Sequence, residues 1–126
     1  MAIVLDASSV LAFLHNELGA EQVRSALLGS LVGAVNWSWV MQKSQQRNVV
    51  VTGMQLDFVL ASVIFVPFTV KHAEIAAQLW EKARALGLLL ADRACMALAL
   101  ERQLPVLTAD RAWSQLGLGL DIQVIR

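Results

Sequence analysis

Short apolar runs alternate along the chain with segments whose apolar positions recur at helical spacing. The apolar runs predict buried strands of the kind found in parallel sheets. They cover residues 2–5, 31–35, 63–66, 105–108 and 122–125. The helical spacing predicts helices over residues 7–14, 20–28, 37–47, 53–62, 70–86 and 94–102, with a short one at 112–116. This alternation predicts an α/β fold, with a mostly parallel central sheet and helices on both faces.

Polar residues mark the start of several predicted helices. Asp6 or Ser8 caps the first helix, Asn36 caps the helix at 37–47, and Thr69 caps the helix at 70–86. Asp92 opens the nearly all-apolar helix at 94–102. The capping residues and the apolar pattern predict the same starting points for these helices.

Composition narrows the class of protein. The chain has 126 residues, which fits a single domain spanning 1–126, and its mean hydropathy of +0.59 excludes a disordered chain. Cys95 is the only cysteine, so neither an internal disulfide nor a cysteine-based zinc site is possible. The net charge of 0 lacks the basic excess of many nucleic-acid binders.

A membrane span is not expected. The longest apolar stretch, residues 49–70, is interrupted by Gln55, Asp57 and Pro67. No basic leader precedes the first apolar run. We therefore expect a cytoplasmic protein without a membrane partner.

Three carboxylates share one pattern. Asp6 directly follows a predicted strand, Asp110 closely follows another, and Asp92 opens a helix. Ligands of open α/β sheets bind beyond the carboxyl ends of the strands, where these side chains can converge. Crowded carboxylates repel one another and suit a divalent cation such as Mg²⁺, which positions a phosphodiester and activates water. Each Asp taken alone is better explained as a helix cap, and only the three together favour a shared site.

The chain resembles the PIN domain family, and within it the VapC-type toxins of bacterial toxin–antitoxin pairs. The resemblance rests on three short motifs and covers nearly the whole chain. They are residues 3–8 (IVLDAS), 91–99 (ADRACMALA) and 107–113 (LTADRAW).

The resemblance implies a PIN-like α/β/α sandwich with the activity of a Mg²⁺- or Mn²⁺-dependent endoribonuclease. It also implies an RNA substrate, a homodimer, and a cognate antitoxin that inserts a peptide into the active groove. By position, Asp6, Asp92 and Asp110 match the family's catalytic, metal-binding carboxylates. Ser8 and Thr108 match small polar residues that support that pocket.

One position departs from the family pattern. Members of the family carry a Glu early in the helix after the second strand, in a run like NWSEV, and here residues 36–40 read NWSWV. Trp39 takes the place of that Glu and cannot bind Mg²⁺. Asn36 and Gln42 lie roughly on the same helix face and offer only neutral oxygens. Two interpretations stay open: a weakened ribonuclease, or an impaired PIN-like module that binds an antitoxin or RNA without cutting.

The basic residues near the motifs have two interpretations each. Arg93 and Arg111 follow two of the Asp residues and either contact RNA phosphates or serve as surface side chains. Lys43 and Arg47 lie one helical turn apart, which favours a solvated face over a basic stripe. A phosphotransfer domain is disfavoured, because no second Asp lies two residues after Asp6.

Overall fold

A computed structural model describes residues 2–126. Its centre is a sheet of five strands in the order β3-β2-β1-β4-β5. The strands are β1 (Val4–Leu5), β2 (Leu31–Gly33), β3 (Ile64–Val66), β4 (Val106–Thr108) and β5 (Ile122–Val124). Every strand pair is parallel, which confirms the predicted α/β class and the parallel sheet.

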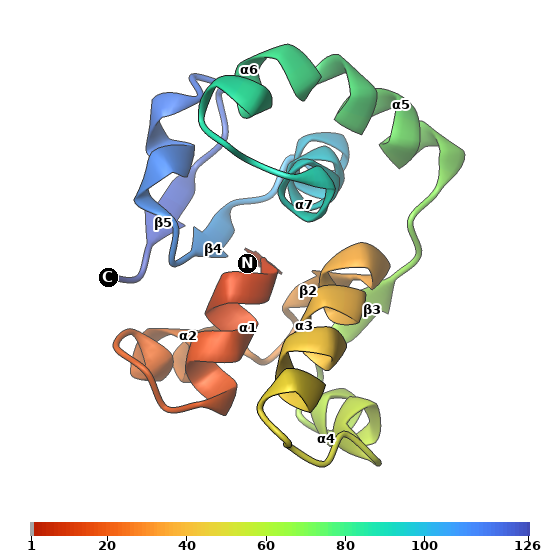
Figure 1. Ribbon diagram of the computed structural model, residues 1–126, viewed down its shortest axis with the longest axis vertical. Helices are drawn as coiled ribbons and strands as arrows, with labels where there is room; N and C mark the ends of the chain where they lie inside the picture. The colour runs from red at the N-terminus through yellow and green to blue at the C-terminus, as the bar shows by residue number, and fades with distance from the viewer. Residues whose placement is uncertain (1) are drawn as a thin grey trace.

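Helices cover both faces of this sheet (Figure 1). Neighbouring strand residues point to opposite faces, so that Val4 and Val106 enter one core and Leu5 and Leu107 the other. The first core packs against α5 (Val70–Gln78), α6 (Trp80–Ala85), α7 (Leu90–Arg102) and the 3₁₀ helix η1 (Arg111–Gln115). The second packs against α1 (Ala7–Leu14), α2 (Ala20–Ala26), α3 (Ala34–Gln46) and α4 (Met54–Leu60). The predicted α/β/α sandwich is thus confirmed.

The strand order fixes where side chains can gather. From β1 the chain adds β2 and β3 on one side, and later adds β4 and β5 on the other. The order therefore reverses between β1 and β4. In open α/β sheets such a switch point leaves a crevice beyond the carboxyl ends of the two strands.

The structure corrects three predicted element boundaries. The helix predicted at 70–86 bends at Leu79 into α5 and α6, which arch over α7 (Figure 1). No glycine or proline marks this bend. Of the two helices, α5 packs most closely against α7. Helix α3 begins at Ala34, and Asn36 lies inside it rather than capping it. Helix α7 begins at Leu90, and Asp92 lies in its first turn.

Two predicted caps are confirmed. The Asp6 side chain accepts from the amide of Ser9 at the start of α1, and the Thr69 side chain accepts from the amide of His72 at the start of α5. Among residues 2–126 no helix is long and apolar enough to cross a membrane.

We predict that Gly19→Ala destabilises the fold by about 2–4 kcal/mol, because two costs add. Gly19 has φ +98°, and a Cβ there would lie 2.7 Å from the Ile125 carbonyl oxygen. Gly29 is the matched control: its φ is +78°, but no atom lies within 4 Å of such a Cβ. Gly29→Ala should cost about 1 kcal/mol. Urea denaturation measures both, and equal losses would contradict the close approach to Ile125.

Candidate functional site

The three predicted carboxylates come from the two sides of the switch point. Asp6 directly follows β1, and Asp110 lies two residues beyond the end of β4. Asp92 lies in the first turn of α7, which packs against β1 and β2. Parallel strands bring their carboxyl ends to one edge of the sheet, and the site is built there.

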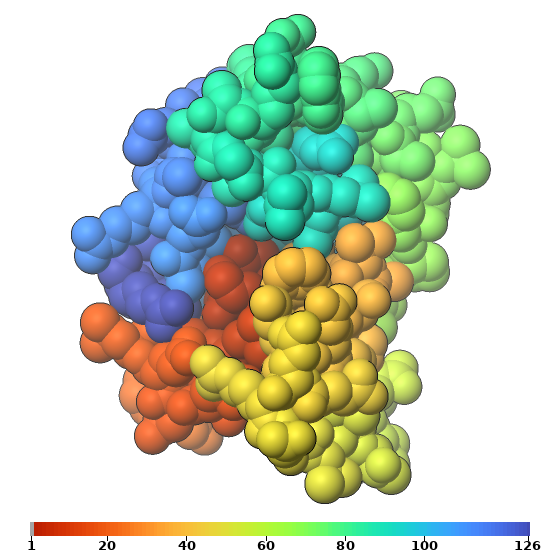
Figure 2. Space-filling model, in the orientation of Figure 1, coloured from red at the N-terminus to blue at the C-terminus, as the bar shows by residue number. Residues whose placement is uncertain are grey.

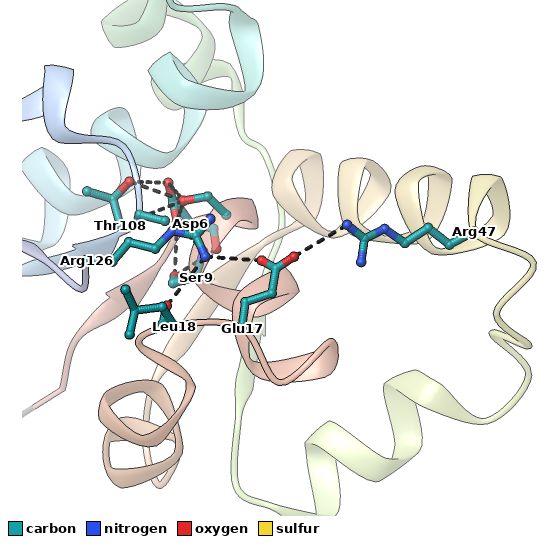
Figure 3. Close-up of polar contacts among 9 residues, drawn as sticks. Asp6, Ser9, Glu17, Leu18, Arg47, Thr108 and Arg126 are labelled. Carbon is teal, nitrogen blue, oxygen red and sulfur yellow. Dashed lines mark hydrogen bonds and ion pairs between the residues drawn. The ribbon is translucent and has the colours of Figure 1, made fainter.

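Asp6 sits at the floor of the site and is 2% exposed. Its Oδ1 accepts from the Ser9 amide at 2.8 Å and lies 3.0 Å from the Ser9 hydroxyl. Its Oδ2 accepts from the Thr108 hydroxyl at 2.6 Å, and the Ser8 hydroxyl lies 2.8 Å from both oxygens. The close-up in Figure 3 shows Asp6 between Ser9 and Thr108. The carboxylate thus joins the first turn of α1 to β4.

These hydrogen bonds offset the free-energy cost of burying the Asp6 carboxylate. Burial raises the pKa of Asp6 above its ordinary value, while the donors from Thr108, Ser9 and Ser8 pull it down. Ser9 was missed at the sequence level as part of this network. Its hydroxyl also lies 3.0 Å from the Leu107 carbonyl of β4. The signal was a second serine directly after Ser8 in an otherwise apolar helix.

Asn36 holds two helix starts together. Its Oδ1 accepts from the Ala7 amide at 2.9 Å, and its Nδ2 donates to the Ala91 carbonyl at 3.0 Å. The side chain is 2% exposed. Because Ala7 and Ala91 are neighbours of Asp6 and Asp92 in the chain, Asn36 fixes the spacing between two of the carboxylates. Asn36 was predicted to cap its own helix, but it links α1 and α7 across the site instead.

Asp92 and Asp110 each accept a hydrogen bond from a nearby backbone amide with one carboxylate oxygen. Asp92 Oδ2 accepts from the Leu89 amide at 2.8 Å, and Asp110 Oδ1 accepts from the Ala112 amide at 2.9 Å. Among the described residues, no hydrogen-bond donor is assigned to their other oxygens. Burial raises the pKa of Asp92, and the negative charge of Asp110 raises it further. The two carboxylates therefore repel each other across the site.

One pocket of about 160 Å³ brings these side chains together. It is lined by Asp6, Ala7, Ser8, Leu11, Trp39, Leu89, Ala91, Asp92 and Asp110. Figure 2 shows a hollow on this face, with the red start of α1 at its floor and α7, α3 and the C-terminal strands around it. Thr108, which hydrogen-bonds Asp6, lies beneath the floor and is fully buried.

Trp39 forms part of the wall of this pocket and is half-buried. It lies three residues after Asn36 on α3, on the helix face that looks toward the carboxylates. Lys43, one turn further along, places its Nζ 4.9 Å from the centre of the Trp39 ring. An indole and a cation thus stand where the resemblance drawn from the sequence predicts a carboxylate.

The carboxylates of the pocket are suitable ligands for a divalent cation, but not all three of them are placed to bind one ion together. Carboxylate oxygens are the hard ligands that Mg²⁺ prefers, and a cation would relieve the repulsion between Asp92 and Asp110. Within residues 2–126, however, no group of three His, Cys, Asp or Glu side chains is placed to hold one ion. Asp6 is engaged by its own donors. The arrangement therefore suits an ion held by two carboxylates, with Asp6 contributing charge from below.

Other candidate residues lie outside the pocket lining. Arg93 donates from Nη1 to the Ala76 carbonyl of α5 at 3.0 Å, and Arg111 donates from Nε to the Arg126 carbonyl at 2.9 Å. Cys95 is buried, and burial together with the charges of Asp6 and Asp92 keeps the pKa of its thiol well above the ordinary value. A protonated, buried thiol is not a nucleophile.

The sequence matches the family model described as PIN domain over residues 3–118. Solved structures of the same shape include a toxin–antitoxin complex from Klebsiella pneumoniae, with a TM-score of 0.75, 15% identity and 98% of each chain covered. A DNA-bound VapBC from Salmonella typhimurium has a TM-score of 0.73 and 12% identity, covering 100% of this chain and 99% of that chain.

FitAcB from Neisseria gonorrhoeae has a TM-score of 0.69 and 18% identity, covering 97% of this chain and 96% of that chain. At these identities the structures are evidence of a shared fold. No curated protein shows significant sequence similarity to the chain.

Asn36→Ala should lower the free energy of unfolding by about 1–3 kcal/mol, because it leaves a buried amide and a carbonyl without partners. Ser38→Ala is the control, because Ser38 is exposed on the same helix and its loss should stay within about 0.5 kcal/mol. Thermal and urea denaturation measure both. A loss for Asn36→Ala no larger than the control would show that Asn36 does not hold the two helix starts.

Asp92→Asn should stabilise the metal-free protein by up to about 1 kcal/mol, because it removes a charge that partial burial and then repulsion from Asp110 disfavour. The amide oxygen can still accept from the Leu89 amide. Millimolar Mn²⁺ should raise the melting temperature of the parent and not that of the variant. An equal Mn²⁺ shift in both proteins would contradict a metal site at Asp92.

Proposed function

The chain belongs to the PIN domain family, and on this basis we propose that it is a metal-dependent endoribonuclease whose activity Trp39 reduces. PIN domains are generally nucleases. The observation that carries the proposal is the pocket lined jointly by Asp6, Asp92 and Asp110 at the switch point of the sheet. Its carboxylates suit Mg²⁺ or Mn²⁺, and a phosphodiester is the substrate that such an ion binds.

Each carboxylate has a separate part in the proposed chemistry. Asp92 and Asp110 would hold the ion through the oxygens that their local amides leave available. Asp6, fixed by Ser8, Ser9 and Thr108, would supply negative charge beneath it. The ion, when bound, would activate water and neutralise charge on the phosphodiester. The leucine side chains at the pocket edge would limit the access of other water.

Trp39 is the reason for expecting reduced activity. It occupies the wall position where the resemblance drawn from the sequence predicts a carboxylate, and it adds bulk without charge. Losing a ligand can weaken metal binding by about 10-fold or more, since even outer-shell losses cost about 10–100-fold. The same observation favours a second candidate: a PIN-like module that binds an antitoxin or RNA without cutting it.

We further propose that the protein is the toxin half of a toxin–antitoxin pair in the cytoplasm. The similar folds of a toxin–antitoxin complex and of VapBC support this. A single domain spanning 1–126 would then take both RNA and antitoxin at the pocket.

A homodimer is the proposed assembly. Exposed apolar side chains lie on α4 and on β3, one of the two edge strands of the sheet, and include Leu56 at 60%, Leu60 at 74% and Ile64 at 52% exposed. An uncovered apolar edge is costly in water and favours association. This surface lies apart from the carboxylates, so the proposed dimer would leave the pocket open.

Trp39→Glu should raise the rate of RNA cleavage in Mn²⁺ by about 10-fold or more, because it restores a charged ligand. Trp39→Gln is the matched control: it removes the ring without adding charge and should leave the rate low. Asp92→Asn in the Trp39→Glu background should abolish cleavage.

Three results would contradict parts of this account. Equal gains from Trp39→Glu and Trp39→Gln would make ring bulk the cause rather than the missing charge. No gain from either would favour the binding module. Cleavage that survives Asp92→Asn would reject the acidic pocket as the nuclease site.

A further inference from the structure

A second hollow of about 240 Å³ adjoins the acidic pocket. Ser8 and Leu11 of α1 line both, so the two hollows lie side by side on α1. The second hollow differs from the first in charge. Lys43, Arg47 and Arg126 line it and face a single carboxylate, Glu17. We call Lys43, Arg47 and Arg126 the cationic cleft.

Glu17 positions two of these cations. Its Oε2 lies 3.4 Å from Arg47 Nη2, and its Oε1 lies 3.2 Å from Arg126 Nη1. Figure 3 shows Glu17 between the two guanidinium groups, which come from the end of α3 and from the end of the described chain. Arg111 holds the Arg126 carbonyl, which steadies that segment. The two guanidinium groups are thus set on either side of Glu17.

We propose that the cationic cleft binds a backbone phosphate of the RNA strand, next to the phosphate held in the acidic pocket. This rests on the proposed ribonuclease function. A strand that crosses from one hollow to the other passes Ser8 and Leu11 and meets positive charge after negative charge. Phosphate contacts of this kind position a strand without reading its sequence.

The donors needed for a phosphate are present. A guanidinium carries five N–H donors, and Glu17 takes only a small part of those on Arg47 and Arg126. With three cations against one carboxylate, the cleft keeps an excess of positive charge. The chain as a whole has a net charge of 0, so this excess is local. Local charge is what a neutral chain needs to attract a polyanion.

His15 adds an independent observation. It lines the cleft, and its buried Nε2 has no hydrogen-bond partner among the described residues. A buried polar nitrogen left unpaired costs about 1–3 kcal/mol. The imidazole would have to turn toward the cleft for a phosphate oxygen to become the partner of this nitrogen.

Stability alone does not explain the cluster. The Arg47 side chain is 55% exposed, and ion pairs this exposed contribute little to folding. The basic residues that follow Asp92 and Asp110 are engaged by backbone carbonyls instead. The sequence motifs suggested Arg93 and Arg111 as phosphate contacts. The cationic cleft therefore provides positive charge for the RNA strand in their place.

The test is binding of a fluorescent single-stranded oligoribonucleotide in EDTA, where no cleavage occurs. Arg47→Ala and Arg126→Ala should each weaken binding by about 5-fold and lower the slope of log affinity against log salt by about 0.7. Glu17→Gln should strengthen binding, because it frees both guanidinium groups.

Arg84→Ala is the matched control. Arg84 is 58% exposed and pairs with Glu81, yet it lies on α6, away from both hollows. Its loss should leave affinity and salt slope unchanged. Equal behaviour of Arg47→Ala and Arg84→Ala would overturn the proposal, as would weaker binding by Glu17→Gln or no binding by the parent. A Glu-rich peptide that binds more tightly than RNA, and loses affinity in the same variants, would assign the cleft to an acidic protein instead.

Cleavage assays in Mn²⁺ separate this proposal from the ribonuclease function. Cleavage that depends on Asp92 but is insensitive to Arg47 and Arg126, with unchanged RNA affinity, would reject the cleft alone. RNA binding that depends on Arg47 and Arg126, in a protein that never cleaves even as Trp39→Glu, would support the cleft and reject the nuclease.

Discussion

The buried carboxylate of Asp6 is the constraint on which the rest of the site depends. It lies where the chain leaves β1, and its oxygens collect donors from α1 and from β4. Without those donors, a charge at 2% exposure would be too costly to keep. The hydroxyls of Ser8, Ser9 and Thr108 therefore belong to the site as much as the carboxylates do. They tie the floor of the pocket to both sides of the switch point.

Charges of both signs surround this floor. Asp92 and Asp110 repel each other above Asp6, while Lys43 stands beside Trp39 at the wall. Beyond Ser8, the charge turns positive at Arg47 and Arg126. Two neighbouring hollows of opposite charge suit a ligand that is itself a chain of phosphates with a metal ion at one end. Trp39 interrupts the acidic part of this arrangement and leaves the basic part intact.

The apolar pattern predicted most of the fold, because each strand is a short, mostly apolar run. It placed α1 at residues 7–14 and located every strand, and its signal is clearest for β1 and β4, which are fully buried. The pattern could not predict helix bends or contacts between residues that are distant in sequence. No glycine or proline marks the break at Leu79, and the role of Asn36 depends on Ala7 and Ala91, which are distant in sequence. Arg47 is exposed, as its interpretation as a solvated residue predicts, but its ion pair with Glu17 forms only in the folded chain.

The most direct measurement is an anomalous difference map from a crystal soaked in Mn²⁺. We predict one strong peak in the pocket, from an ion bound by oxygens of Asp92 and Asp110 and adjacent to Asp6. In an Asp92→Asn crystal under the same soak, that peak should disappear. An empty pocket in the parent, or a peak that persists without the Asp92 charge, would contradict the claim that these carboxylates form a metal site.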